Sequence, residues 1–166
     1  NTPAEARDLV RRLKSENVDA IKIAYDDMSW ATTQAIPALN PNVMAAIISE
    51  SHVVGLKAYV HAPILKYAKE ALRAGADGLV HGIVSDPVDE EFIALMKKNG
   101  AVYISTLSLF EACADIRGWT RRLEAFDQKG TLKAMWTEWA NPASLRQFEA
   151  IYNNTSYVTK RMPIVR

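Results

Sequence analysis

The feature that most constrains the fold is a repeated pattern that begins at Leu56. A helical segment, a glycine, a short apolar strand and a polar exit recur about every 20 residues. Parallel strands need a crossover connection, which is usually a helix, and such crossovers are right-handed in nearly all proteins. The pattern therefore predicts an α/β fold in which neighbouring strands are parallel and helices cover the sheet.

The expected elements follow from apolar periodicity and from the positions of proline and glycine. Strands are expected near residues 18–24, 56–61, 77–81 and 101–106. A first helix is expected from Thr2 and Pro3 onwards, and three more over residues 41–54, 63–74 and 86–99. Residues 107–152 are expected to form a helical region rich in aromatic side chains.

The number of strands is half of what a closed parallel barrel requires. Such a barrel has eight strands and typically about 250 residues, whereas this chain has 166 residues. We therefore interpret residues 1–166 as one domain, a partial (β/α)8 TIM barrel of about four βα units. Half a barrel leaves two strand edges unpaired. We expect either a segment of a larger chain or a unit that completes itself by association, for example as a homo-oligomer.

The composition argues against several classes of partner. The 20 basic and 19 acidic residues are interspersed, so we expect no patch for nucleic acid or an anionic membrane. No apolar run approaches the ~18 residues of a membrane span, and the single Cys113 excludes an internal disulfide. A cytoplasmic location is favoured, but a signal peptide in a missing N-terminal part would change that expectation.

Two histidines stand where short apolar strands are expected to end. His61 lies in Tyr59-Val-His-Ala-Pro63 and His81 in Leu79-Val-His-Gly-Ile83. If both strands are parallel neighbours, their carboxyl ends lie at one edge and the imidazoles converge. Two neutral imidazoles aimed at one point suit a divalent metal. A lone histidine is more often a core residue with a backbone partner, and we interpret His52 as structural.

Lys22 is the third candidate, because it lies between Ile21 and Ile23 and points to the other side of its strand. One interpretation is an exposed lysine on an edge strand. The other is a desolvated lysine inside a barrel, whose lowered pKa leaves a neutral amine. That amine can react with carbon dioxide to form a carbamate, which can bridge two metal ions, or it can attack a substrate carbonyl to form a Schiff base.

Polar residues near two strand ends are weaker candidates. Asp26 and Asp27 follow the lysine strand and could accept hydrogen bonds from metal ligands or contact substrate, although a solvated loop or a helix cap is commoner. Tyr103 and Ser105 alternate on the fourth strand and are candidate substrate-binding residues. Packing is the preferred role for Tyr103.

With these residues assembled, the chain resembles the amidohydrolase superfamily, in its imidazolonepropionase-like and Xaa-Pro-dipeptidase-like branch. The matching segments cover most of residues 1–110, and they are Val18–Ile23, Val60–Ala62, Ala68–Gly82 and Asp89–Met96. Members of this family are metal-dependent (β/α)8 barrels. A lysine on the fourth strand, often carbamylated, bridges the metals, and histidines on the fifth and sixth strands bind one of them.

The resemblance implies roles for three residues and a reaction. Lys22 would be the bridging ligand, His61 and His81 the terminal pair, and the four strands the fourth to the seventh of the barrel. One or two divalent ions are implied, with zinc favoured, and a metal-activated water would hydrolyse the C–N bond of a small amide, peptide-like or cyclic substrate. The family's His-x-His pair is absent from this sequence, and its general-base aspartate is expected beyond Arg166. The chain alone is therefore expected to be inactive or nearly so.

Two other classes of function remain open at this point. One is a barrel aldolase or lyase that uses Lys22 as a Schiff base. The other is a non-catalytic half-barrel scaffold that binds partners through its open edges. We favour the hydrolase, because the two alternatives leave the paired histidines without a role.

Overall fold

The computed structural model describes residues 2–30 and 35–114, and, further on, residues 118, 121, 122, 125, 126, 129 and 130. The chain divides into two compact units, Asn1–Thr106 and Leu107–Arg166. Helix α5 (Leu107–Ala114) belongs to the second unit. Most of the helical region predicted over residues 107–152 lies outside the described residues. The candidate site lies in the first unit.

A parallel sheet forms the centre of the first unit. Its four strands are paired in the order β1-β2-β3-β4, and every pair is parallel. The strands are β1 (Ala20–Ala24), β2 (Lys57–His61), β3 (Gly78–Val80) and β4 (Val102–Ile104). The predicted α/β fold with four parallel strands is confirmed, and each strand is slightly shorter than the sequence suggested.

Helices precede or connect the strands, and local side-chain caps set their ends. They are α1 (Pro3–Ser15), α2 (Pro41–Val53), α3 (Leu65–Arg73) and α4 (Glu90–Asn99). In α1, the Thr2 hydroxyl accepts from the amide of Glu5, and the Glu5 carboxylate accepts from the amide of Thr2. This reciprocal pair is a capping box and satisfies two amides that the helix itself cannot.

Helix α4 begins later than predicted. The sequence suggested a start at residues 86–87, but Asp89 is the N-cap residue. Its carboxylate accepts a hydrogen bond of 2.9 Å from the amide of Phe92. The side-chain cap of Asp89, rather than the proline at position 87, therefore sets the start of α4. Residues 86–88 belong to the loop that follows β3.

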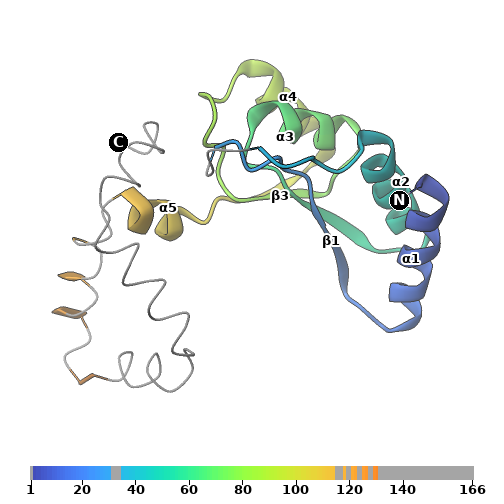
Figure 1. Ribbon diagram of the computed structural model, residues 1–166, viewed down its shortest axis with the longest axis horizontal. Coiled ribbons are helices and arrows are strands. Elements are labelled where there is room, and N and C mark those ends of the chain that lie inside the picture. Colours follow the sequence, from blue (N-terminus) through green and yellow to red (C-terminus); the bar gives the residue numbers. More distant parts are fainter. Residues whose placement is uncertain are drawn as a thin grey trace. The chain divides into compact units, whose positions relative to one another are not determined.

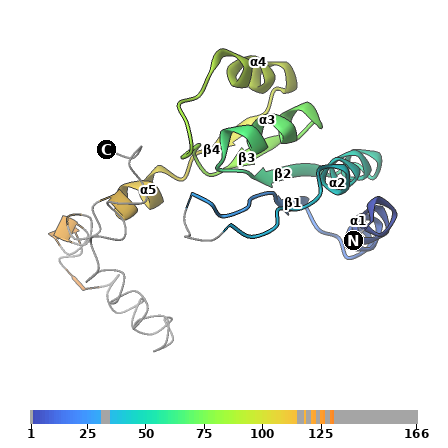
Figure 2. The ribbon, with the colours of Figure 1, turned by 45° about the horizontal axis from the view of Figure 1, so that its top comes forward.

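The core of this unit fills the space between one face of the sheet and helices α1 to α4, which follow one another in chain order (Figures 1 and 2). Alternate strand residues point into it, and they are Ile21, Ile23, Ala58, Val60 and Leu79. The helices contribute Val10, Met44, Ile48, Leu65, Ala68, Leu72 and Phe92, among others. The other face of the sheet is therefore the one on which polar side chains can gather.

Among the described residues, none of the helices combines the length and the apolar character that crossing a bilayer requires.

Candidate functional site

The register of the sheet sets which side chains share the face opposite the core. One row across the strands runs through Lys22, Tyr59, Gly78 and Val102, and the next through Ala24, His61, Val80 and Ile104. We call the face that carries these two rows the histidine face. Lys22 and His61 therefore lie on the same face of adjacent strands, with His61 nearer the carboxyl ends.

His81 does not occupy the same register position as His61. The register partner of His61 is Val80, and His81 comes one residue later, after β3 has ended. Regular alternation would turn its side chain towards the helices. Its backbone has a φ of 76° instead, which lies in the left-handed region.

This left-handed residue lets the two imidazoles meet. The ring centroids of His61 and His81 are 4.7 Å apart, and the rings are nearly perpendicular at 77°. The amide of His81 donates to the carbonyl of Ile104 at 2.8 Å, which ties the turn to β4. The structure thus brings together the two histidines that the sequence singled out, by a backbone conformation that the sequence did not reveal.

Each imidazole uses one ring nitrogen in a hydrogen bond. Nε2 of His61 lies 3.0 Å from Oδ2 of Asp26, and Nδ1 of His81 lies 3.1 Å from the hydroxyl of Thr106. Thr106 is also left-handed, with a φ of 50°. Among the described residues, Nδ1 of His61 and Nε2 of His81 have no hydrogen-bond partner, so these are the two nitrogens that remain for a ligand.

The electrostatic surroundings favour the neutral form of His81. Burial lowers the pKa of this imidazole, and the electrostatic effects of the neighbouring His61 and Lys22 lower it further, against an opposing effect of Asp26. Neutral imidazole is the form that binds metals.

Lys22 itself is exposed on β1, and β1 has a single neighbour, β2, in the sheet that the structure describes. This matches the interpretation of an exposed lysine on an edge strand. The burial that a carbamate or a Schiff base would need is not supplied by the described residues.

Asp26 is buried beside the histidines. Its carboxylate accepts from Nε2 of His61, from the indole nitrogen of Trp30 at 2.8 Å and from the amide of Met28 at 3.0 Å. Of the roles left open by the sequence, the structure gives Asp26 that of an acceptor for a candidate ligand. A ligating histidine usually donates its second nitrogen to such a carboxylate, and this rule is the signal that could have singled out Asp26 beforehand.

Asp27 makes different contacts. Its carboxylate accepts from the amide of Ser29 at 2.9 Å and from the hydroxyl of Tyr67 on α3 at 3.0 Å. The hydrogen bond from Ser29 lowers the pKa of Asp27, although partial burial opposes this. Asp27 therefore anchors the loop after β1 to α3.

Tyr103 lies on the helix-covered side of the sheet, because its register partner is the core residue Leu79. Its ring packs against Phe92 with centroids 5.9 Å apart, and its hydroxyl accepts from the amide of Ile83 at 2.8 Å. These contacts agree with the packing role preferred from the sequence. Ser105 follows the end of β4. The substrate-binding role suggested for both residues stays a prediction.

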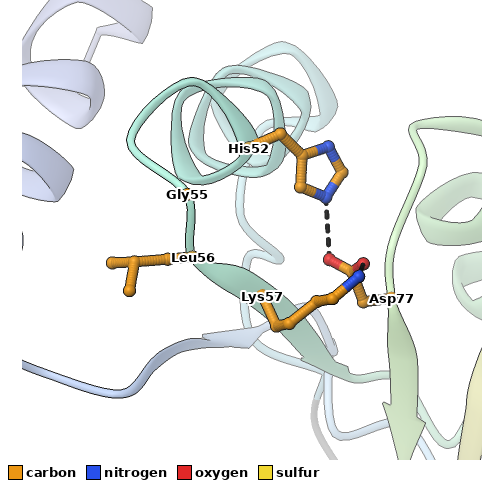
Figure 3. A pocket seen from close by; sticks show the side chains of 5 residues that line it. All are labelled: His52, Gly55, Leu56, Lys57 and Asp77. Carbon is orange, nitrogen blue, oxygen red and sulfur yellow. Dashed lines mark hydrogen bonds and ion pairs between the residues drawn. The ribbon is translucent and has the colours of Figure 1, made fainter.

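A pocket of about 450 Å³ lies at the opposite ends of the strands, and it is lined by His52, Gly55, Leu56, Lys57 and Asp77 (Figure 3). Asp77 accepts hydrogen bonds from His52 and Lys57, both at 2.7 Å, and from the amide of Ala58 at 2.9 Å. Burial opposes ionisation of Asp77, but these donors outweigh it and keep its pKa below the usual value. The amino-terminal end of barrel strands serves stability rather than chemistry, so we assign this cluster a structural role.

The histidine pair fits part of a metal site. It offers two imidazole nitrogens as donors, and zinc sites are built from such donors together with sulfur or oxygen. Across residues 2–30 and 35–114 and the few described later, no group of three or more His, Cys, Asp or Glu residues could hold an ion. Further ligands would have to come from elsewhere.

No family model and no curated protein matches this sequence. Solved structures do match. An Xaa-Pro dipeptidase with methionine bound in its active site is 31% identical, with a TM-score of 0.58 over 69% of this chain and 28% of that structure. Ochratoxinase from A. niger is 23% identical, with a TM-score of 0.59 over 75% of this chain and 29% of its own.

A prolidase in complex with N-methylphosphonate-L-proline matches over more of the sequence than these two structures. It is 21% identical, with a TM-score of 0.58 over 94% of this chain and 36% of that structure. At such identities the last two matches speak for the fold alone. The chain spans only 28%, 29% and 36% of the lengths of these three proteins. Together with the parallel sheet, they confirm the predicted resemblance: the chain has the fold of part of a barrel of the amidohydrolase superfamily.

Proposed function

We propose that this chain supplies part of the metal centre of a hydrolase that cleaves C–N bonds in small amide, peptide-like or cyclic amide substrates. The observation that carries the proposal is the contact between the imidazoles of His61 and His81 at the carboxyl ends of β2 and β3. Their ring centroids are 4.7 Å apart. Barrel enzymes have their chemistry at this end of the strands. The name of the similar structure at 31% identity, an Xaa-Pro dipeptidase, supports a hydrolase.

In this proposal the two histidines bind the ion through the nitrogens that have no hydrogen-bond partner among the described residues. These are Nδ1 of His61 and Nε2 of His81. Lys22 would be the third ligand, as a carbamate, once the histidine face is covered and the amine is desolvated. Imidazole and carboxylate donors suit zinc as well as other divalent metals, and we expect one or two ions.

The bound ion would supply Lewis acidity, which polarises the substrate carbonyl and makes a water acidic enough to attack at neutral pH. The protein's own part is to hold the donors in place and unprotonated. Burial favours the neutral form of His81, and Asp26 holds the ring of His61. We propose that the remaining ligands and the group that transfers protons come from residues beyond the described strands or from another chain.

Zinc binding tests the proposal directly. The affinity of the purified 166-residue chain would be measured by competition with a chromogenic chelator, for the wild type and for His61→Ala and His81→Ala. We expect each substitution to weaken binding at least about tenfold, because each removes a donor that bonds the ion itself.

His52→Ala is the matched control, since it removes an imidazole at the opposite end of the strands and should leave zinc affinity unchanged. Equal affinities for His61→Ala, His81→Ala and His52→Ala would refute the proposal. Treatment with borohydride and a carbonyl substrate distinguishes the lyase alternative from the hydrolase. A lyase that uses Lys22 as a Schiff base would acquire a covalent label on Lys22. Under the hydrolase proposal no label forms.

A further inference from the structure

We propose that Asp26 is a positioning residue, which fixes the ring of His61 so that Nδ1 is the nitrogen offered to an ion. This inference rests on the proposed function. Oδ2 of Asp26 lies 3.0 Å from Nε2 of His61, and the side chains are 4% and 20% exposed. An ionised carboxylate can only accept a hydrogen bond, so Nε2 carries the proton and Nδ1 the lone pair.

The carboxylate acts through His61 rather than as a ligand of its own. The oxygen that accepts from His61 also accepts from the indole of Trp30 at 2.8 Å, and the other oxygen accepts from the amide of Met28 at 3.0 Å. Rotating Asp26 towards an ion would break these bonds in a buried place, which is costly. Both oxygens are therefore committed to holding the loop and the imidazole.

Tyr25, the residue before Asp26, is anchored to α3 and to β2, and this fixes the position of Asp26. The hydroxyl of Tyr25 donates to Glu70 on α3. The rings of Tyr25 and Tyr67 pack with centroids 4.9 Å apart. The amide of Tyr25 also donates to the carbonyl of His61 at 2.9 Å. Asp26 is thus held relative to the backbone of the histidine that it contacts.

The ring of His81 is oriented by its backbone rather than by a carboxylate. Its partner, the hydroxyl of Thr106, can donate as well as accept, so it does not decide which nitrogen carries the proton. The left-handed backbone of His81 directs the ring instead. Loss of the Asp26 carboxylate should therefore change the tautomer of His61 and leave that of His81 as it was.

The test is nitrogen-15 NMR of the imidazoles in the metal-free 166-residue chain, at about pH 8.5, two units above the ordinary imidazole pKa of ~6.5. The three histidines are assigned from His52→Gln, His61→Gln and His81→Gln. In the wild type we expect His61 to be entirely the Nε2–H tautomer. In Asp26→Ala we expect a mixture in which the Nδ1–H form appears.

Asp27→Ala is the matched control, because it removes a carboxylate from the same loop that contacts Tyr67 and no imidazole. It should leave the tautomer of His61 unchanged. Zinc affinity should fall about 10- to 100-fold in Asp26→Ala, the usual effect of losing a partner of a ligating histidine, and should not fall in Asp27→Ala. If Asp26→Ala does not fold, Asp26→Asn replaces it, with Asp27→Asn as its control. The amide oxygen is a weaker acceptor, so both effects keep their direction and shrink.

A wild-type His61 in the Nδ1–H form would overturn the inference, and so would a tautomer that is the same in the Asp26 and Asp27 variants. Failure of the proposed function looks different. If the tautomers behave as expected but no protein in the series binds zinc, the metal centre is wrong and the contact between Asp26 and His61 stands.

Discussion

Gly78 is the position where we expect a single added methyl group to disturb the sheet most. It lies in β3 on the histidine face, between Tyr59 and Val102 in register. A Cβ atom there would lie 2.7 and 2.9 Å from two ring carbons of Tyr59, and 2.9 Å from the carbonyl oxygen of Val102. The tyrosine ring can rotate away, but the carbonyl belongs to the backbone of β4. Gly78→Ala must therefore shift a strand.

The size of the effect follows from two opposing contributions. Overpacking in a close-packed region costs about 1–3 kcal/mol. Replacing a strand glycine by alanine returns about 0.5–1 kcal/mol, because glycine loses more backbone entropy on folding. Taking the middle of each range, we expect the free energy of unfolding to fall by about 1 kcal/mol. Urea unfolding followed by circular dichroism measures it, with an unchanged m-value as the sign of an unchanged transition.

A double-mutant cycle shows whether the tyrosine ring is the obstacle. In a Tyr59→Ala background two of the three short contacts disappear, so Gly78→Ala should destabilise the protein by about 0.5–1 kcal/mol less than in the wild type. Gly100→Ala is the contrast, since its cost of roughly 1 kcal/mol comes from a φ of 58° with open space around the glycine. It should be independent of Tyr59. A Gly78→Ala protein as stable as the wild type would refute the reasoning.

Two further predictions concern stability away from the histidines. Asp77→Asn should lower the free energy of unfolding by about 1.5–3 kcal/mol at neutral pH, the usual contribution of hydrogen bonds to a charged group. Because folding lowers the pKa of Asp77, its stabilisation is complete above the unfolded pKa of ~3.9 and disappears as the pH falls through the folded value. Urea titrations from neutral pH downwards should show the difference between wild type and variant closing below about pH 4, and a constant difference would contradict it. Ile48→Ala should cost about 2–5 kcal/mol in thermal or urea unfolding, since Ile48 is fully buried in α2 at 0% exposure. Val53→Ala, at 75% exposure on the same helix, should change stability by less than about 0.5 kcal/mol, and equal effects would refute the packing argument.

The sheet and one face of it could be predicted from local patterns. Ile21, Lys22 and Ile23 alternate in the sequence, and the structure buries the two isoleucines and exposes the lysine. Strand alternation depends only on the pleat, which every residue of the strand obeys. The cap of α1 could also be predicted from local sequence, because Thr2 and Glu5 interact across a single turn.

The geometry of the candidate site could not be predicted so easily. The direction of the His81 side chain depends on one backbone torsion after β3, and no periodic pattern encodes it. The partner of His61 lies 35 residues away, in a loop whose shape depends on the contacts of Asp26 and Asp27. The side of the sheet on which Tyr103 lies follows from the register of β3 and β4, which no local pattern shows.

The left-handed conformation of His81 limits which residue types this position accepts, and it also sets the direction of the side chain. Histidine, like asparagine and aspartate, enters that region more readily than most residues, whereas a β-branched side chain such as valine is strongly disfavoured there. Grafting the imidazole pair onto another parallel sheet at matched register positions would place both rings on one row, without reproducing this perpendicular meeting. A designer who wants the same arrangement has to build the turn first and choose the ligand afterwards.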